Sequence, residues 1–97
     1  MTIYKTRPGV VLTELGGEYA LVAVKSLYKV CPYITQINES SAFLWRQMEQ
    51  GTDMDRLMAA VSDEYELDDP NAARAEIEAF IRQLKELKYI LTFDKSS

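Results

Sequence analysis

Residues 9–24 read Gly-Val-Val-Leu-Thr-Glu-Leu-Gly-Gly-Glu-Tyr-Ala-Leu-Val-Ala-Val, and they set the architecture of the N-terminal part. Two β-rich segments, 9–15 and 18–24, flank the pair Gly16-Gly17. Such a pair favours a two-residue hairpin turn, because glycine adopts the positive φ values that this turn needs. A third β-rich segment, 33–37, alternates its side chains between two faces. The first third of the chain therefore predicts a small antiparallel β-meander.

Three helical patterns follow these strands. Apolar residues repeat at helical spacing and predict helices over about 39–50, 53–65 and 70–87. Residues 89–93 read as a short extended tail. The expected capping residues are Asn38, Thr52 or Asp53, and Asp69. The expected core stripes are Ala42, Leu44, Trp45 and Met48 in the first helix; Met54, Leu57, Met58, Val61 and Tyr65 in the second; and Ala73, Ile77, Phe80, Leu84 and Leu87 in the third.

Three strands cannot bury an apolar face by themselves, so the helices must cover the sheet. The sequence predicts an α+β, winged-helix-like domain in which an N-terminal three-stranded antiparallel sheet is followed by three helices. A chain of 97 residues supports one hydrophobic core. We therefore expect one domain over 1–97, with its core between about residues 7 and 91.

Composition removes many kinds of active site. The chain has 47% hydrophobic and 27% charged residues, no histidine and one cysteine, Cys31. Nucleophile–histidine pairs and histidine metal ligands are therefore absent, and no internal disulfide is available. The polar start and the lack of a long apolar run predict a cytoplasmic protein without a membrane partner. We expect no catalytic residues, no metal and no cofactor.

Charge is uneven along the chain. The net charge is −4, which argues against a nucleic-acid partner, since domains that bind phosphate backbones are usually basic. Residues 1–37 include four basic and two acidic residues. Residues 38–69 include two basic and nine acidic residues, and residues 70–97 include five basic and four acidic residues. The two flanking segments could form a weakly positive surface suited to an acidic peptide. The commoner meaning of such charge runs is a solvated face.

Several segments follow one another in a characteristic order: Arg7-Pro8-Gly9-Val10, Gly17-Glu18-Tyr19, Ile37-Asn38-Glu39-Ser40-Ser41-Ala42, the Asp53 to Tyr65 helix, the Asp69-Pro70 helix start and Ala75-Glu76-Ile77-Glu78-Ala79-Phe80-Ile81. This ordered set resembles the PqqD-like family over about Arg7 to Leu91. The resemblance implies a RiPP recognition element. Such domains hold the leader segment of a ribosomally made precursor peptide while a maturation enzyme, often a radical SAM enzyme, modifies the core segment. They are chaperones and not enzymes.

The resemblance also implies where a leader would bind. An extended peptide adds as a strand to the third strand, in the groove beside the third helix, because an edge strand offers free backbone groups. We expect the backbone pairing from Tyr33, Ile34, Thr35, Gln36 and Ile37. On the third helix, the face next to the core stripe presents Arg74, Glu78, Ile81 and Lys85.

Ile81 is the residue of this helix face that we expect to form the apolar floor of the groove. On this hypothesis, Ile81→Glu abolishes leader binding without disturbing the fold, and Lys85→Glu weakens binding in a salt-dependent way. The alternative is that Ile81 merely widens the core stripe, as amphipathic helices often allow.

Besides a small enzyme, for which the chain has carboxylates and tyrosines but no histidine, two other functions stay open at this point. A winged-helix DNA-binding regulator has the same succession of elements, although helix 70–87 mixes basic and acidic residues and fits a major groove poorly. A structural module is the other, because a free edge strand can pair with a second copy and form a homodimer.

Overall fold

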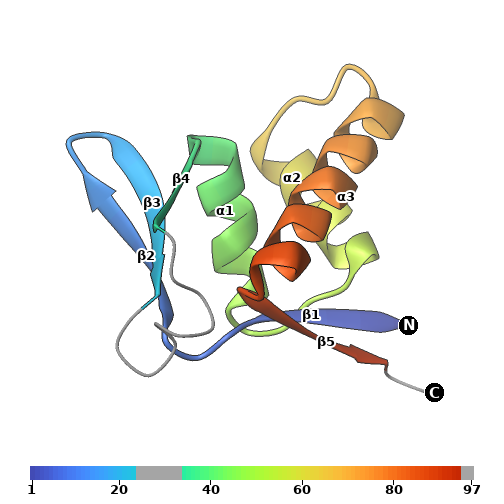
Figure 1. The fold of residues 1–97 in the computed structure, drawn as a ribbon. Helices are drawn as coiled ribbons and strands as arrows, with labels where there is room; N and C mark the ends of the chain where they lie inside the picture. Colours follow the sequence, from blue (N-terminus) through green and yellow to red (C-terminus); the bar gives the residue numbers. More distant parts are fainter. Residues whose placement is uncertain (24–33, 95–97) are drawn as a thin grey trace.

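The structure is a computed structural model that describes residues 1–23 and 34–94. Its elements follow the chain in the order strand, strand, strand, strand, helix, helix, helix, strand (Figure 1). They are β1 (Thr2–Thr6), β2 (Val10–Leu15), β3 (Glu18–Ala23), β4 (Ile34–Ile37), α1 (Glu39–Met48), α2 (Met54–Glu64), α3 (Pro70–Leu87) and β5 (Ile90–Asp94). The predicted α+β class, with an antiparallel sheet followed by three helices, is confirmed.

The predicted meander is the sheet β2-β3-β4, which is antiparallel throughout. Gly16 and Gly17 connect β2 to β3 with φ values of 61° and 84°. Both are positive, as the two-residue turn requires. The register places Leu21 of β3 between Leu12 and Thr35, and Leu21 is fully buried. One face of the sheet therefore packs against the helices.

A second, two-stranded sheet was not predicted. β1 pairs antiparallel with β5, from Thr2 opposite Asp94 to Thr6 opposite Ile90. The N-terminal residues were expected to be a polar start outside the core, but Tyr4 also forms a bridge with Thr52 and packs against the core. The extended tail at 89–93 is correspondingly a paired strand. This pairing joins the two ends of the described chain, so no local sequence pattern predicts it.

The helices begin at the predicted caps. The Oδ1 atom of Asn38 accepts a hydrogen bond from the amide of Ser41 (2.8 Å), and Asp69 caps α3 in the same manner. Of the two candidates for α2, Asp53 is the cap, since its Oδ1 accepts from the amide of Arg56 (2.9 Å). These bonds satisfy amide groups that have no partner within the helix.

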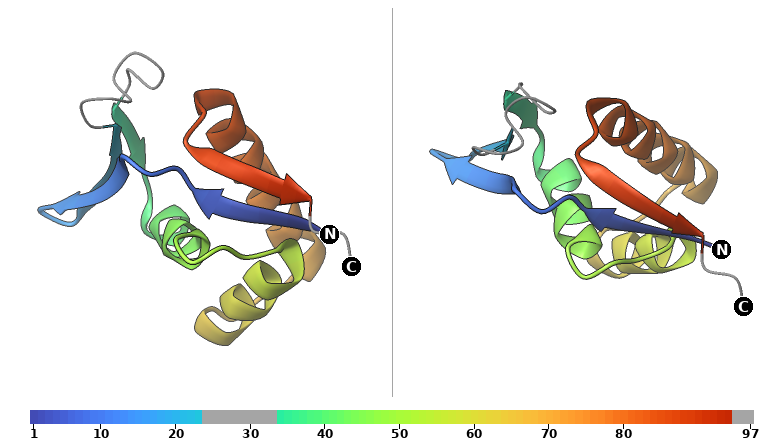
Figure 2. Two further views of the ribbon diagram at one scale, coloured as in Figure 1. Left: turned by 90° about the horizontal axis from the view of Figure 1, so that it is seen from below. Right: turned by 60° about the horizontal axis from the view of Figure 1, so that its bottom comes forward.

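The core lies where α1 packs between the three-stranded sheet and the other helices (Figure 2). The largest fully buried side chains are Trp45, Tyr89, Leu21, Met48, Leu57 and Leu84. Ile81 belongs to the same cluster and is only 5% exposed. No helix in the described ranges is long and apolar enough to cross a membrane.

Candidate peptide-binding site

β4 is an edge strand within the described part of the chain. It pairs on one side with β3, from Val22 opposite Ile34 to Tyr19 opposite Ile37. Its other side is turned toward α3 (Figure 2). An edge strand exposes every second backbone N–H and C=O group, and an incoming extended peptide can satisfy them. Tyr33, the first of the predicted pairing residues, lies outside the described residues.

The side chains of β4 alternate between solvent and core. Ile34 is 73% exposed and Gln36 is also exposed, whereas Thr35 and Ile37 are half-buried on the helix-covered face. The Thr35 hydroxyl lies 3.4 Å from the hydroxyl of Tyr89, just after α3. This contact connects the edge strand to the end of α3.

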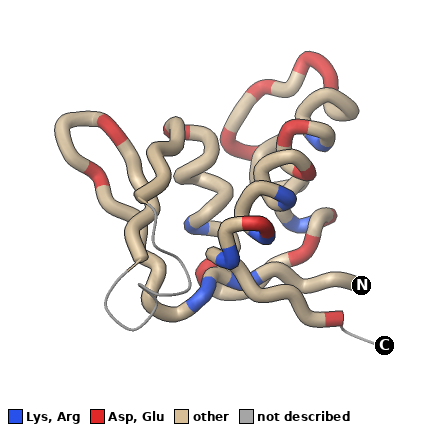
Figure 3. Tube along the Cα trace, viewed as in Figure 1, with Lys and Arg blue, Asp and Glu red and all other residues tan. Residues whose placement is uncertain are grey.

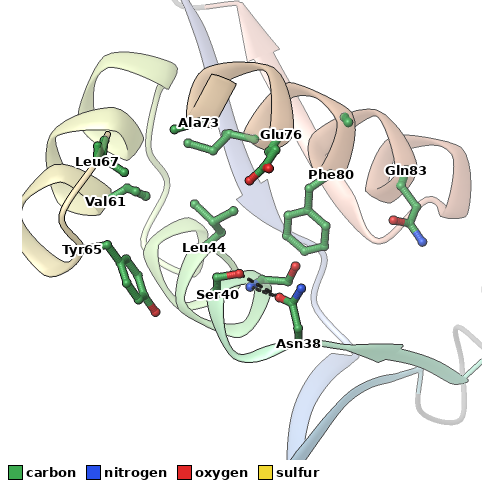
Figure 4. A pocket seen from close by; sticks show the side chains of 13 residues that line it. Asn38, Ser40, Leu44, Val61, Tyr65, Leu67, Ala73, Glu76, Phe80 and Gln83 are labelled. Carbon is green, nitrogen blue, oxygen red and sulfur yellow. Dashed lines mark hydrogen bonds between the residues drawn. The ribbon is translucent and has the colours of Figure 1, made fainter. Parts of the chain in front are cut away.

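A pocket of about 530 Å³ lies next to the end of β4 (Figure 4). It opens between the start of α1, the end of α2 and one face of α3, and Asn38, which directly follows β4, is part of its wall. The pocket is lined by Asn38, Ser40, Ser41, Leu44, Val61, Tyr65, Leu67, Ala73, Glu76, Ile77, Ala79, Phe80 and Gln83. A peptide added to β4 would continue toward this pocket.

The polar groups at the start of α1 are already engaged with one another. Asn38 Oδ1 accepts the Ser41 amide and, at 2.9 Å, the Ser40 hydroxyl. Across the pocket, burial and the nearby carboxylates of Glu39 and Glu64 raise the pKa of Tyr65 above its ordinary value of 10.0.

The structure does not place the four predicted helix residues in that pocket. Glu78, Ile81 and Lys85 line a different pocket of about 400 Å³ with Tyr4 and Met54. Arg74 lies on this same side of the molecule, where its Nε atom is 3.2 Å from the Glu78 carboxylate. Whether these side chains contact a peptide stays a prediction.

Ile81 is 5% exposed and packs in the core cluster with Ile77 and Leu84, so it widens the apolar stripe of α3. It also lines the pocket of about 400 Å³ together with Glu78 and Lys85, as the expected apolar floor would, and its contact with a peptide stays a prediction. Ile81 is buried because residues of β1 and α2 cover the side of α3 on which it lies.

Sequence reasoning did not single out the α3 residues Glu76, Ala79 and Gln83, which line the pocket together with Asn38. Their spacing places them beside Phe80 on the other flank of the core stripe. The helical period defines both flanks of the apolar stripe of α3 equally well, but it does not predict which flank faces the edge strand.

No group of three acidic or cysteine side chains in the described ranges is arranged to hold an ion.

Comparison with known proteins gives one family and a fold. Residues 12–90 match the family model described as coenzyme PQQ synthesis protein D (PqqD). No curated protein sequence matches the chain closely enough to count as a relative. The structure of TbiB1 in complex with the TbiA(beta) leader peptide is similar at a TM-score of 0.72 and 16% identity, covering 94% of this chain and 99% of TbiB1. The structure of lasso peptide synthetase B1 complexed with the leader peptide is similar at a TM-score of 0.70 and 20% identity. The match covers 91% of this chain and 96% of the synthetase chain.

Proposed function

This chain belongs to the PqqD family, and from that membership we propose that it is a non-catalytic RiPP recognition element. Residues 1–97 act as one domain that binds the leader segment of a ribosomally made precursor peptide. The leader adds as a strand to β4, in the groove between β4 and α3. The domain then presents the precursor to a maturation enzyme in the cytoplasm. Two solved structures of this fold, TbiB1 and lasso peptide synthetase B1, are complexes with leader peptides.

The observation that carries the proposal is the edge of β4 beside an apolar pocket. Backbone pairing with β4 supplies affinity with little demand on the peptide's sequence. The pocket that starts at Asn38 then selects a peptide side chain, since Leu44, Val61 and Phe80 form its apolar wall. The two elements adjoin because β4 ends where α1 begins.

The expected strength is that of a reversible complex. About four backbone hydrogen bonds at roughly 1 kcal/mol each, and one or two apolar anchors at roughly 1.5–3 kcal/mol each, favour binding. The ordering of a flexible peptide opposes them and leaves a dissociation constant on the order of micromolar. A weak grip is sufficient, because a second contact with the maturation enzyme would raise the local concentration of substrate at its active site.

An amide NMR titration tests the proposal. ¹⁵N-labelled protein is titrated with the N-terminal segment of a short precursor encoded beside its gene. We expect saturable shifts in β4, at Asn38 and on the α3 face of Glu76, Ala79 and Gln83. Shifts at Arg74, Glu78 and Lys85 would instead assign the groove to the opposite face of α3. The absence of shifts at high peptide excess contradicts leader binding at β4.

The DNA-binding alternative has no support among the matched proteins, neither of which is described as binding DNA. The negative net charge also opposes it. Titration of the labelled protein with a random-sequence duplex in low salt is the direct check, and salt-dependent shifts on α3 would revive this function.

A further inference from the structure

The pocket beside β4 combines an apolar floor with an acidic rim. Its floor is formed by Leu44, Val61, Ile77 and Phe80, and the last two are largely buried. Glu76 is exposed and extends from α3 over this space (Figure 4). The rim of the pocket is therefore polar, whereas its floor is apolar.

Two further carboxylates directly neighbour residues that line the pocket. Glu39 lies between Asn38 and Ser40, and Glu64 precedes Tyr65; Glu39 and Glu64 are both exposed. Acidic residues also gather on the connection from α2 to α3 (Figure 3). Glu76 lines the pocket, and Glu39 and Glu64 lie next to lining residues, so the three carboxylates come to the pocket from three different helices.

No lysine or arginine lines this pocket in the described part of the chain. The cations of α3 lie on its other side, where Arg82 and Lys85 line the pocket near Tyr4 and Arg74 pairs with Glu78. That other side also carries Glu78 and Glu86, so its charges are mixed, whereas the only charged residue of α3 that lines the pocket beside β4 in the described part of the chain is Glu76.

The start of α1 has the opposite polarity and must be weighed against these carboxylates. A helix N-terminus corresponds to roughly half a positive charge, and its effect fades within the first turn. Here Asn38 already occupies the Ser41 amide, and Glu39 sits in that first turn. Three full negative charges outweigh this partial charge, so the mouth of the pocket favours a cation.

We propose that this pocket selects leaders in which a large apolar residue is adjacent to a lysine or arginine. The apolar side chain enters between Leu44 and Phe80, and the neighbouring cation lies at the rim near Glu39 and Glu76. The inference rests on the proposed function, since it needs a peptide paired with β4. It reverses the expectation of an acidic peptide that segment charges alone suggested.

The position of this residue pair within the leader follows from strand direction. Both pairings of the three-stranded sheet are antiparallel, and a peptide added in the same sense runs opposite to β4. β4 runs toward Asn38 and the pocket. The apolar residue and its basic neighbour therefore precede the strand-paired segment of the leader.

Selection from a random library of 12-residue peptides by mRNA display tests this inference and does not require the sequence of the leader. Among the bound peptides, we expect the frequency of lysine or arginine next to a large apolar residue to be about two- to fivefold higher than in the input library. This factor corresponds to the binding free energy of one exposed ion pair. In anisotropy measurements on a selected peptide, replacing that cation by glutamine weakens binding by the same factor. The difference vanishes in about 1 M salt, where screening is nearly complete.

A matched pair of variants isolates the rim. The double variant Glu39→Gln, Glu76→Gln removes two rim carboxylates and should lose the enrichment of basic residues. The control Glu49→Gln, Glu86→Gln removes two exposed carboxylates that line other pockets and changes the net charge equally. It should select the same basic peptides as the wild type. Circular dichroism confirms that both variants are folded.

The outcomes separate this inference from the function on which it rests. Peptides that shift β4 amides but show no basic preference, or an acidic one, overturn the inference and leave leader binding standing. Basic enrichment that survives equally in the rim variant also overturns it. If no peptide shifts the amides of β4, the proposed function fails as well.

Discussion

Tyr65 shows how one side chain reports on the charge of the pocket. Tyr65 is one of the residues that line the pocket, and its ring meets that of Phe43 edge-on at 5.6 Å between centroids. Burial is the main cause of its raised pKa, and Glu39 and Glu64 add to it by repelling the phenolate. The pKa of Tyr65 is therefore a direct probe of the rim carboxylates.

We predict that Glu39→Gln lowers the pKa of Tyr65 toward 10.0 without reaching it, because burial and Glu64 still act. The measurement is a pH titration of the Tyr65 ring carbon by NMR. Glu49→Gln is the control and should leave the midpoint unchanged. An unchanged midpoint in Glu39→Gln would mean that Glu39 does not face the pocket.

The raised pKa of Tyr65 also predicts how stability depends on pH. The unfolded tyrosine ionises near its ordinary value of 10.0, whereas the folded one holds its proton to higher pH. The stabilising contribution is thus complete below pH 10.0 and is lost as the pH rises through the folded pKa. Denaturant unfolding above pH 10 should show a steeper fall in stability for the wild type than for Tyr65→Phe. Equal slopes would contradict this.

Ile81 offers a second test at the scale of a residue. Its side chain is 5% exposed in the core cluster, so a glutamate there would be an unpaired buried charge. We predict that Ile81→Glu lowers the free energy of unfolding by more than about 3 kcal/mol. Loss of binding in this variant would therefore reflect unfolding and not a damaged groove.

The exposed neighbour Lys85 supplies the comparison. Lys85→Glu should change the free energy of unfolding by less than about 1 kcal/mol, since it alters charge only at the end of α3. Urea unfolding followed by circular dichroism measures both variants. A native-like midpoint for Ile81→Glu would show that Ile81 is accessible after all.

At the scale of elements, β1 connects more parts of the fold than its sequence predicts. Two backbone hydrogen bonds of 2.7 and 3.0 Å join Tyr4 to Thr52, in addition to the ladder with β5. Thr52 directly precedes Asp53, the cap of α2. β1 therefore ties the C-terminal strand to the connection between α1 and α2.

Replacing Thr2–Thr6 by Gly-Ser-Gly-Ser-Gly should lower the free energy of unfolding by about 2–4 kcal/mol, because strand pairing and the packing of Tyr4 are lost. The control is Lys5→Thr, an exposed change that keeps the β preference of the strand. Thermal unfolding compares the variants. Equal stability would mean that β1 contributes nothing to the core.

At the scale of the whole molecule, the free edge of β4 can serve only one partner. A second copy of the chain paired at β4 would occupy the groups that a leader needs. A homodimer through this edge and leader binding therefore exclude each other, and mass action decides between them.

We predict that any dimer formed through β4 dissociates when a β4-binding peptide is added. Sedimentation velocity at increasing peptide concentration should show conversion to a monomer–peptide complex. A dimer that persists with peptide bound would use another surface. The outer face of the sheet, with Val11 opposite Val22 and Val22 opposite Ile34, is the apolar alternative.

The sequence alone determined the elements whose signals are local. The glycine pair placed the β2–β3 turn, and the capped stripes placed the three helices, with α3 at its predicted bounds of 70–87. The same ordered segments pointed to the family that the match over 12–90 shows. Turn chemistry, capping and helical periodicity act within a few residues, which is why they can be read directly.

Only the tertiary structure decided what depends on distant contacts. The pairing of β1 with β5 joins opposite ends of the described chain, and the orientation of α3 buries Ile81 while turning Glu76 and Gln83 toward the end of β4. A helical period defines a stripe and its two flanks but not the neighbours of each flank. Packing assigns these neighbours, because one flank of α3 lines a pocket with β1 and the start of α2, and the other lines the pocket with the start of α1.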